Sequence, residues 1–544
     1  MIRPARALSA ASLVSLVGCG PGTLGGAGGT SASATDSATT SSASGTGGGL
    51  GGASASSSGS GGHGGSGPTI TPAPFDWVGI ISTGQSLSVG ATGAPVVSTT
   101  QPFSNLMLSD ASPPPKLDGN GDMLSLVPLT APIRPPGGGA PAYPDNIIGE
   151  TPSEGTSNQI SALTMALGKF DTVSVASNVG ESGQSITVIE KGGTGNAFAS
   201  TLYEGAAIKA LAAQKGKSFG YGAILLTHGE TDANDAAYAA QITKLSDDYN
   251  ADLKALTGQK QDIPMLISQQ GTFPPDANSY AQSTLAEWQL GVTSPGKFLC
   301  VGPKYQYEHS ADHVHFPAAQ YRRLGEKYGE VYVRALLMKE AWAPLQPTTV
   351  SRSGAVITVN FHVPDPPLAW EDAISMPHQE VVKAWSKGRG FEIADSTGVL
   401  TIASVAIAGT SVMVTLSAPP AGQGVTLSYA MIQDKSGYSG GTDNGRRGQL
   451  RDSDAFLGYD AQTISCDVQQ GSATITATFP GSLVQRSTTD IVAGQGLIDD
   501  TVVMARSGDT MTLNHPWTGA SGSVMLAFHA DQRNYAVQFA LPVP

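Results

Sequence analysis

Positive charge and long apolar runs are scarce in this chain. Lysine and arginine number 30 against 43 acidic residues, and no basic cluster offsets the net charge of -13. This balance excludes nucleic acid and anionic membrane surfaces as partners. After the amino terminus no segment holds eighteen consecutive apolar residues, so we expect no later part of the chain to cross a membrane.

Cysteine is scarce as well, since only Cys19, Cys300 and Cys466 occur. Cys300 and Cys466 have no clustered histidines beside them, so they do not form a zinc site. A disulfide between them is compatible with export, but they fall in different predicted domains and the pattern leaves their pairing open. Residues 118–122 alternate acidic residues as a calcium loop does, yet they lack the bidentate glutamate and suit a hairpin turn better. We predict no metal site.

The amino terminus has the pattern of an export signal. Arg3 and Arg6 precede an apolar run, residues 7–17, that is too short to span a bilayer. Leu16-Val17-Gly18-Cys19 resembles the lipobox of bacterial lipoproteins, in which the cysteine is lipidated. We therefore expect residues 1–19 to be a lipoprotein signal peptide with lipidation at Cys19. The alternative is an ordinary secretory signal that contains a chance cysteine.

The location implied by this resemblance is the bacterial cell envelope, with the protein lipid-anchored and facing outward. The lipid would be its only contact with a membrane. Gly20 after Cys19, in place of aspartate, resembles lipoproteins sent to an outer membrane. Residues 20–74 are nearly all Gly, Ser, Thr and Ala and cannot bury enough surface to offset chain entropy, so we expect a disordered, flexible tether.

About 470 of the 544 residues follow the tether, enough for two or three domains. In residues 75–343 short β-branched runs alternate with helical patterns, which predicts an α/β domain with a parallel sheet covered on both faces. One helix is expected within 235–256 and another from Pro317 to about residue 340. The Pro- and Gly-rich insert 101–150 is expected to be a long surface excursion. The predicted strands are 77–82, 172–177, 221–227, 264–268 and 298–302.

The character of the sequence changes after residue 343. Alternating apolar and polar stretches are separated by Gly, Pro and Asp turns, the pattern of a β-sandwich. We predict a sandwich-like all-β domain over 344–456 and a second β-rich domain over 457–544. Whether these are two modules or one larger unit is left open.

Several polar residues follow the ends of the predicted parallel strands, where such sheets bind ligands. Ser86 follows the first strand, Gly183 the second and His228 the third, while Asp312 and His315 lie beyond the fifth. A serine hydroxyl needs a base to act as a nucleophile, and a carboxylate can orient that base. The sequence therefore predicts a catalytic site of Ser86, His315 and Asp312.

These motifs together resemble the SGNH hydrolases, and within them the sialate O-acetylesterase-like group that includes carbohydrate esterase family six. The match lies in roughly residues 75–340. The resemblance implies a three-layer αβα, flavodoxin-like fold and hydrolysis of an ester, typically an acetyl group on a sugar. The matching motifs are Gly84-Gln85-Ser86, Ser182-Gly183-Gln184-Ser185-Ile186, His228-Gly229-Glu230-Thr231-Asp232 and Asp312-His313-Val314-His315.

The sequence leaves two assignments in the site undecided, the donors of the oxyanion hole and the histidine that acts as the base. The backbone N–H groups of Ser86 and Gly183 can form an oxyanion hole, with Gly180 the fallback. His228 stands where the family usually has glutamine, and it is either a third oxyanion donor or a buried structural histidine. His313 competes with His315 as the base, but the spacing from Asp312 favours His315.

The sequence therefore predicts a serine esterase that removes acetyl or similar acyl groups from carbohydrate through a Ser-His-Asp triad and an acyl-enzyme, without a cofactor. Its partner would be an acetylated carbohydrate, whose identity the sequence does not give. The rival hypothesis is a catalytically inactive surface protein that binds glycans or mediates adhesion. The altered oxyanion residues and the tether favour that rival.

Overall fold

The computed structural model describes residues 69–110, 124–136, 142–271, 281–380, 382–432, 446–480, 483, 490–498 and 501–544. The predicted signal peptide with Cys19, the tether up to residue 68 and the candidate calcium loop 118–122 lie outside these residues. Ser66–Pro544 form one compact unit. Over the described ranges no helix combines the length and the apolar character that a membrane span requires.

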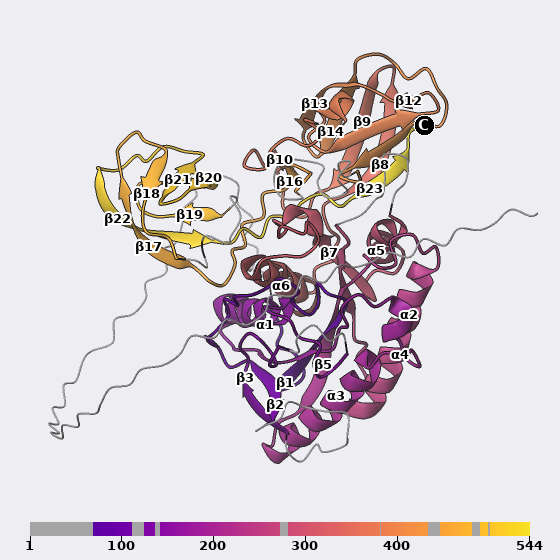
Figure 1. Ribbon diagram of the computed structural model, residues 1–544, viewed down its shortest axis with the longest axis vertical. Helices are drawn as coiled ribbons and strands as arrows, with labels where there is room; N and C mark the ends of the chain where they lie inside the picture. The colour runs from indigo at the N-terminus through magenta and orange to yellow at the C-terminus, as the bar shows by residue number, and fades with distance from the viewer. Residues whose placement is uncertain are drawn as a thin grey trace, which may run out of the picture. The chain divides into compact units, whose positions relative to one another are not determined.

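The first region contains a seven-stranded sheet with the order β3-β2-β4-β1-β5-β6-β7 (Figure 1). Strands β1, β4, β5, β6 and β7 are parallel and confirm the five predicted strands. The strands are β1 Trp77–Gly84, β2 Leu106–Asp110, β3 Leu124–Pro128, β4 Val173–Asn178, β5 Phe219–Thr227, β6 Met265–Gln269 and β7 Phe298–Pro303.

Strands β2 and β3 come from the insert that we expected to be a surface excursion. They pair with each other antiparallel, and β2 pairs parallel with β4, so part of the insert extends the sheet. Leu108 and Leu124 are buried by this pairing. Because Pro and Gly dominate the insert, its two short strands gave no clear alternating pattern.

Helices cover both faces of the sheet. Side chains alternate along β1, so Ile80 packs against α1 and α6 while Ile81 faces a second core built with α3 and α4. The predicted helices are confirmed as α4 and α6, and Pro317 is the N-cap of α6. The helices are α1 Pro152–Leu163, α2 Ile186–Ile189, α3 Ala197–Gln214, α4 Tyr238–Thr257, α5 Gln282–Thr293 and α6 Ala318–Tyr332.

The remainder of the chain is β-rich, as predicted. Two four-stranded sheets, β13-β14-β9-β8 and β12-β11-β15-β23, share one apolar core, and β10 pairs with β16. These strands are β8 Gln346–Ser353, β9 Val356–His362, β10 Ala369–Trp370, β11 Phe391–Asp395, β12 Gly398–Val399, β13 Ile402–Ala408, β14 Ser411–Leu416, β15 Thr426–Tyr429, β16 Leu450–Arg451 and β23 Phe539–Pro542.

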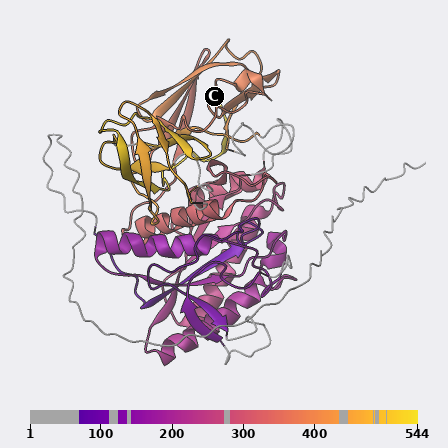
Figure 2. The same ribbon diagram turned by 60° about the vertical axis from the view of Figure 1, so that its left-hand side comes forward.

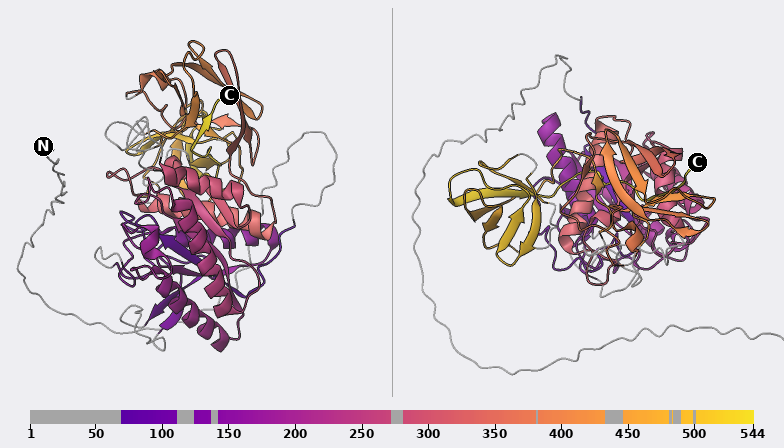
Figure 3. Two further views of the ribbon diagram at one scale, coloured as in Figure 1. Left: turned by 90° about the vertical axis from the view of Figure 1, so that its right-hand side faces the viewer. Right: turned by 90° about the horizontal axis from the view of Figure 1, so that it is seen from above.

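A separate six-stranded antiparallel sheet has the order β19-β22-β17-β18-β21-β20 and its own core (Figure 3, yellow). Its strands are β17 Gln462–Val468, β18 Thr474–Thr476, β19 Ile491–Ala493, β20 Val503–Ser507, β21 Thr510–Leu513 and β22 Gly522–His529. After this sheet the chain returns to the first β region, where the last strand, β23, pairs with β15. The predicted extent of a second domain, 457–544, therefore does not match the strand pairing at its carboxyl end, because Phe539 packs in the core of the first β region.

The two cysteines inside the described ranges are free and buried. Cys300 lies in β7 and packs in the core shared with the two four-stranded sheets, whereas Cys466 lies in β17 in the core of the six-stranded sheet. The pairing that the sequence left open does not form.

Helix α6 is buried along its whole length, although much of it is charged. Its charges find partners in the β regions: Arg323 Nη2 lies 2.6 Å from Asp531 Oδ1, and Lys327 Nζ lies 3.6 Å from Asp454 Oδ2. Buried charges require such partners, because desolvation alone costs several kcal/mol per ion. These ion pairs bind α6 to the β-rich part of the chain.

On its other side α6 packs closely on α1 through glycines (Figure 2). A Cβ atom at Gly155 would come within 2.2 Å of the Arg322 carbonyl oxygen, and one at Gly325 within 2.2 Å of the Pro152 oxygen. Gly→Ala in a helix normally stabilises by about 1 kcal/mol. At these two positions we expect the opposite sign, a loss of about 1–3 kcal/mol from overpacking, measured by urea unfolding.

Gly291→Ala in α5 is the matched control, because its Cβ would lie 3.3 Å from the nearest atoms, those of Cys300. We expect this variant to unfold at nearly the wild-type urea concentration. A Gly155→Ala protein as stable as the wild type would contradict the close contact between α1 and α6.

Candidate active site

Ser86 lies in a tight turn directly after β1. Gly84 makes the turn with a φ of 134°, and a Cβ there would come within 2.0 Å of the Thr227 carbonyl oxygen, so only glycine fits. The Gln85 N–H donates to the Thr227 oxygen at 3.1 Å, which ties the turn to the end of β5. The Ala91 and Val89 N–H groups donate to the Ser86 carbonyl and close the turn. Ser86 is thereby held at the carboxyl edge of the sheet.

The loop before α6 holds the other two predicted residues. One Asp312 oxygen, Oδ1, accepts from the N–H groups of Val314 and His315 at 3.0 Å each. The other, Oδ2, lies 2.7 Å from His315 Nδ1. Asp312 therefore fixes both the loop and the ring. Burial tends to raise the pKa of Asp312, but the hydrogen bonds from the His315 ring and from these two backbone groups outweigh it and hold the pKa below 3.8.

The structure brings the three predicted residues into one hydrogen-bonded row. His315 Nε2 lies 2.7 Å from Ser86 Oγ, although the two residues are 229 positions apart in the sequence. Since the Asp312 carboxylate can only accept, Nδ1 donates its hydrogen bond to Asp312, and in the neutral ring the Nε2 lone pair faces the serine hydroxyl. Ser86 is 7% exposed, while the His315 side chain is 21% exposed, so the row opens to solvent.

Among the described residues, the backbone N–H groups of Ser86 and Gly183 have no hydrogen-bond acceptor. Gly183 has a φ of 71° and no atom would lie within 4 Å of a Cβ there. Gly180, the fallback, is packed instead against the turn that holds Ser86, where a Cβ would meet Ser88 Oγ at 1.9 Å. The predicted pair of donors is therefore unoccupied by other protein groups, as an oxyanion hole requires.

His228 does not serve as the third oxyanion donor that we predicted. It is fully buried, with Nε2 3.1 Å from the Gln184 carbonyl oxygen and Nδ1 2.9 Å from the Tyr238 hydroxyl. A carbonyl can only accept, so Nε2 carries the proton and donates a hydrogen bond to the Gln184 carbonyl oxygen. Burial lowers the pKa of His228 to about 3, so the ring is neutral and Nδ1 is an acceptor. His228 is therefore a buried structural histidine, the second of the two roles that the sequence allowed.

The rest of the third motif also has structural partners. Glu230 Oε1 lies 2.7 Å from Nζ of Lys304, a buried lysine that our sequence reasoning missed. Asp232 Oδ2 accepts from the Ile186 N–H at 2.8 Å and so holds the first residue of α2. The first contact joins the loops after β5 and β7, and the second joins the loops after β4 and β5. Lys304 follows directly after β7, and that position at a strand end was the only signal for it.

Our sequence reasoning also missed a group of polar residues that holds the turn containing Ser86. Asn178, the last residue of β4, donates from Nδ2 to the Ser88 carbonyl oxygen at 2.7 Å. The Asn178 carbonyl in turn accepts from the guanidinium of buried Arg134, which pairs with Glu204 at 2.9 Å. Arg134 stands in the insert, far from any motif, and no sequence pattern pointed to it.

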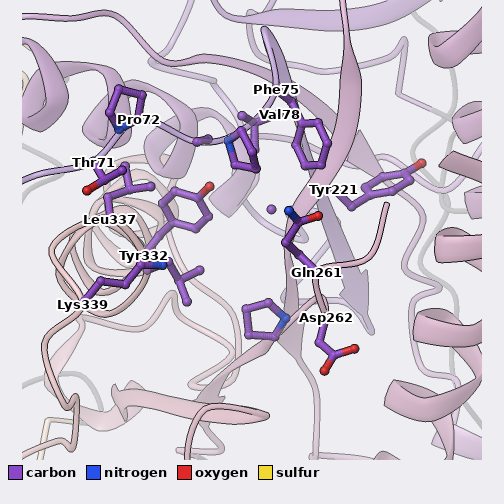
Figure 4. Close-up of a pocket in the computed structure, with 15 residues that line it drawn as sticks. Thr71, Pro72, Phe75, Val78, Tyr221, Gln261, Asp262, Tyr332, Leu337 and Lys339 are labelled. Atoms are coloured by element: carbon purple, nitrogen blue, oxygen red, sulfur yellow. The ribbon is translucent and has the colours of Figure 1, made fainter. Parts of the chain in front are cut away.

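Another pocket, of about 150 Å³, lies at the opposite end of the sheet (Figure 4). Phe75, Val78, Tyr332 and Leu337 line it, at the amino ends of β1 and β5. None of the predicted site residues reaches it. It is therefore not a candidate for the chemistry.

The pH dependence of stability tests whether His228 is buried and neutral. The folded protein holds the ring neutral with a pKa of about 3, whereas the unfolded chain titrates near 6.5. Between these values the unfolded state binds more protons, so stability from this residue is full above pH 6.5 and falls as the pH drops. His228→Gln removes the titration and keeps a donor for Gln184. Relative to this variant, we expect the wild type to lose up to about 1.4 kcal/mol per pH unit below pH 6.5 in urea unfolding. Parallel pH profiles of the two proteins would contradict a neutral, buried ring.

Comparison with known proteins covers three of the four motifs, since residues 84–86 lie outside the matched range. Residues 169–334 match the family model described as "Carbohydrate esterase, sialic acid-specific acetylesterase". No curated protein matches the chain. Among solved structures, XAC1771, described as a novel carbohydrate acetylesterase from Xanthomonas citri, is 16% identical, with 69% of this chain and 77% of that chain covered and a TM-score of 0.43. NanS is 12% identical, with 49% and 98% covered and a TM-score of 0.34. This family match confirms the resemblance predicted from the motifs, and with it that the chain is a hydrolase of the carbohydrate esterase type.

Proposed function

We propose that Ser86, His315 and Asp312 are the catalytic triad of a serine esterase that removes acetyl groups from carbohydrate. The observation that carries this proposal is the His315 ring, which lies 2.7 Å from both Ser86 Oγ and Asp312 Oδ2. An imidazole between a hydroxyl and a carboxylate can take the serine proton while the carboxylate stabilises the imidazolium.

The reaction proceeds in two steps through an acyl-enzyme. Ser86 Oγ attacks the ester carbonyl and passes its proton to His315 Nε2. The N–H groups of Ser86 and Gly183 stabilise the negative oxygen of the tetrahedral intermediate. His315 then gives its proton to the departing sugar oxygen, which breaks the bond to the acyl carbon. Water repeats the sequence on the acyl-enzyme and releases acetate.

The substrate class in this proposal comes from the family that matches residues 169–334. The helices on both faces of the sheet support the flavodoxin-like, three-layer SGNH fold within which the triad would act. The catalytically inactive glycan-binding protein is the weaker hypothesis, because such a protein has no need to keep an aligned row of serine, histidine and aspartate. Which glycan carries the acetyl group stays open between sialic acid, xylan, pectin and bacterial glycans.

Hydrolysis of 4-nitrophenyl acetate tests the triad. We expect Ser86→Ala and His315→Ala each to lower kcat/KM by at least about 1,000-fold, because members of a triad act as one unit. A fluorophosphonate probe should label the wild type and fail to label His315→Ala. Acetate release from acetylated xylan, acetylated pectin and O-acetylated sialic acid then identifies the substrate.

His313→Asn is the matched control, since His313 is the neighbouring histidine and asparagine tolerates its positive φ of 59°. This variant should keep a rate within a few-fold of the wild type. A folded Ser86→Ala protein that hydrolyses the ester at the wild-type rate would show that the nucleophile is a different residue.

We also propose that the protein is lipid-anchored at Cys19 and faces outward from the bacterial envelope. The basic residues Arg3 and Arg6, the apolar run 7–17 and the lipobox-like end of that run support this proposal. The Gly- and Ser-rich tether 20–74 would then separate the enzyme from the membrane and let it reach substrate.

Fractionation of a bacterial host that processes lipoproteins tests the anchor. We expect the wild type in the membrane fraction and Cys19→Ala in the soluble fraction, because a lipid on Cys19 is the proposed attachment. Ser86→Ala, which leaves the amino terminus intact, should fractionate as the wild type does. A wild-type protein found only in the soluble fraction would contradict lipid anchoring.

A further inference from the structure

A polar pocket of about 250 Å³ lies outside the triad, where three distant segments of the chain meet. The segment 97–103 contributes Ser98 and Phe103, helix α6 contributes Arg322, and the start of β17 with the residues before it contributes Asp460 and Gln462. Pockets at the junction of two regions are common places for ligands. The proposed triad uses none of these residues, and only Arg322 among them lies within the family match, residues 169–334.

The walls of this pocket are fixed by contacts within the protein. Buried Glu150 Oε2 accepts from the Val97 and Ser98 N–H groups at 2.8 and 3.0 Å. The ring of Phe103 lies edge-on to Tyr459 with a centroid distance of 6.1 Å, and the Tyr459 hydroxyl accepts from Asn158 Nδ2 at 3.2 Å. The pocket is therefore preorganised.

The charges of the pocket are balanced. Arg322 Nη2 lies 2.8 Å from Asp460 Oδ2, and Gln462 Nε2 donates to the same carboxylate oxygen at 2.8 Å. An anionic ligand would meet the Asp460 carboxylate, and a cationic ligand would meet the Arg322 guanidinium. The pocket thus suits a neutral ligand that both donates and accepts hydrogen bonds.

A sugar hydroxyl has that double character, and guanidinium, carboxylate, amide and hydroxyl groups can all bind it. Phe103 and Tyr459 add apolar ring surface for the C–H groups of a pyranose. The volume is below the range of about 300–1,000 Å³ that holds drug-sized ligands, so the space suits one sugar ring and not a long oligosaccharide.

The pocket is also near the catalytic row along the chain. Arg322 follows His315 by seven positions, and an extended chain of that length spans at most about 25 Å. Most of this stretch is helical and therefore shorter. A glycan of a few rings can reach from one place to the other.

We propose that this pocket binds one neutral pyranose ring of the glycan whose acetyl group Ser86 removes. The pocket is an accessory subsite that holds the polysaccharide while the ester is presented to the triad. This assignment to the substrate rests on the proposed esterase function, whereas the binding of a sugar by the pocket does not.

Saturation-transfer NMR with glucose, galactose, mannose and xylose tests the binding directly. We expect the wild type to bind at least one of these pyranoses. Phe103→Ala and Gln462→Ala each remove one wall of the pocket from a partly exposed position and should weaken that binding about tenfold, as the loss of one stacking or hydrogen-bonding partner does. Gln469→Ala, the same change at an exposed residue outside the pocket, should leave binding unchanged.

Kinetics separate this proposal from the esterase proposal. On 4-nitrophenyl acetate, which has no sugar, the two pocket variants should keep the wild-type rate. On the acetylated polysaccharide that releases acetate, they should raise KM about tenfold and leave kcat unchanged. Failure of all four pyranoses to bind the wild type, or binding that survives both substitutions, would overturn the subsite. A wild type that binds sugar but hydrolyses no ester would instead overturn the esterase function.

Discussion

The structure depends on one helix that is buried on every side although it carries many charges. All residues of α6 are buried, and its cations meet carboxylates from the β-rich part of the chain, among them Asp454 and Asp531. Breaking a buried pair typically costs about 3–5 kcal/mol, because the remaining charge is left without a partner. The β-rich part of the chain therefore supplies the negative charges that the buried cations of α6 require, and the first region depends on it for stability. The close glycine contacts with α1 leave α6 no freedom to shift on its other side.

This fixed helix explains how the candidate site is assembled. His315 stands two residues before Pro317, the N-cap of α6, and Ser86 stands in a turn hydrogen-bonded to the end of β5, so each side chain is positioned by main-chain geometry. Asp312 then needs only a local loop to hold the ring. The buried network of His228, Glu230 and Lys304 lies behind these groups and keeps the strand-end loops together.

Much of this arrangement could be predicted from the sequence. Buried parallel strands have continuous apolar runs, so the five strands were predicted to within about two residues, and the strand-end rule brought Ser86, Asp312 and His315 to one edge. The role of His228 could not be predicted, because its motif position gives no information on which atoms its ring nitrogens contact. Lys304 and Arg134 were missed since a buried cation is recognised only by its partners, and those are distant in sequence. The pairing of β23 with β15 is likewise a long-range contact that no local pattern encodes.

The return of the chain to β23 has a consequence for how the six-stranded sheet is joined to the rest. Gly458, where the chain departs, donates its N–H to the Ala530 carbonyl oxygen, where the chain comes back, at 3.0 Å. Leu457 and Asp531 form a bridge beside it. The two ends of the intervening stretch are therefore adjacent in space. A deletion or exchange of the six-stranded sheet in evolution would leave two chain ends that can be joined directly, without disturbing the four-stranded sheets on either side of it in the sequence.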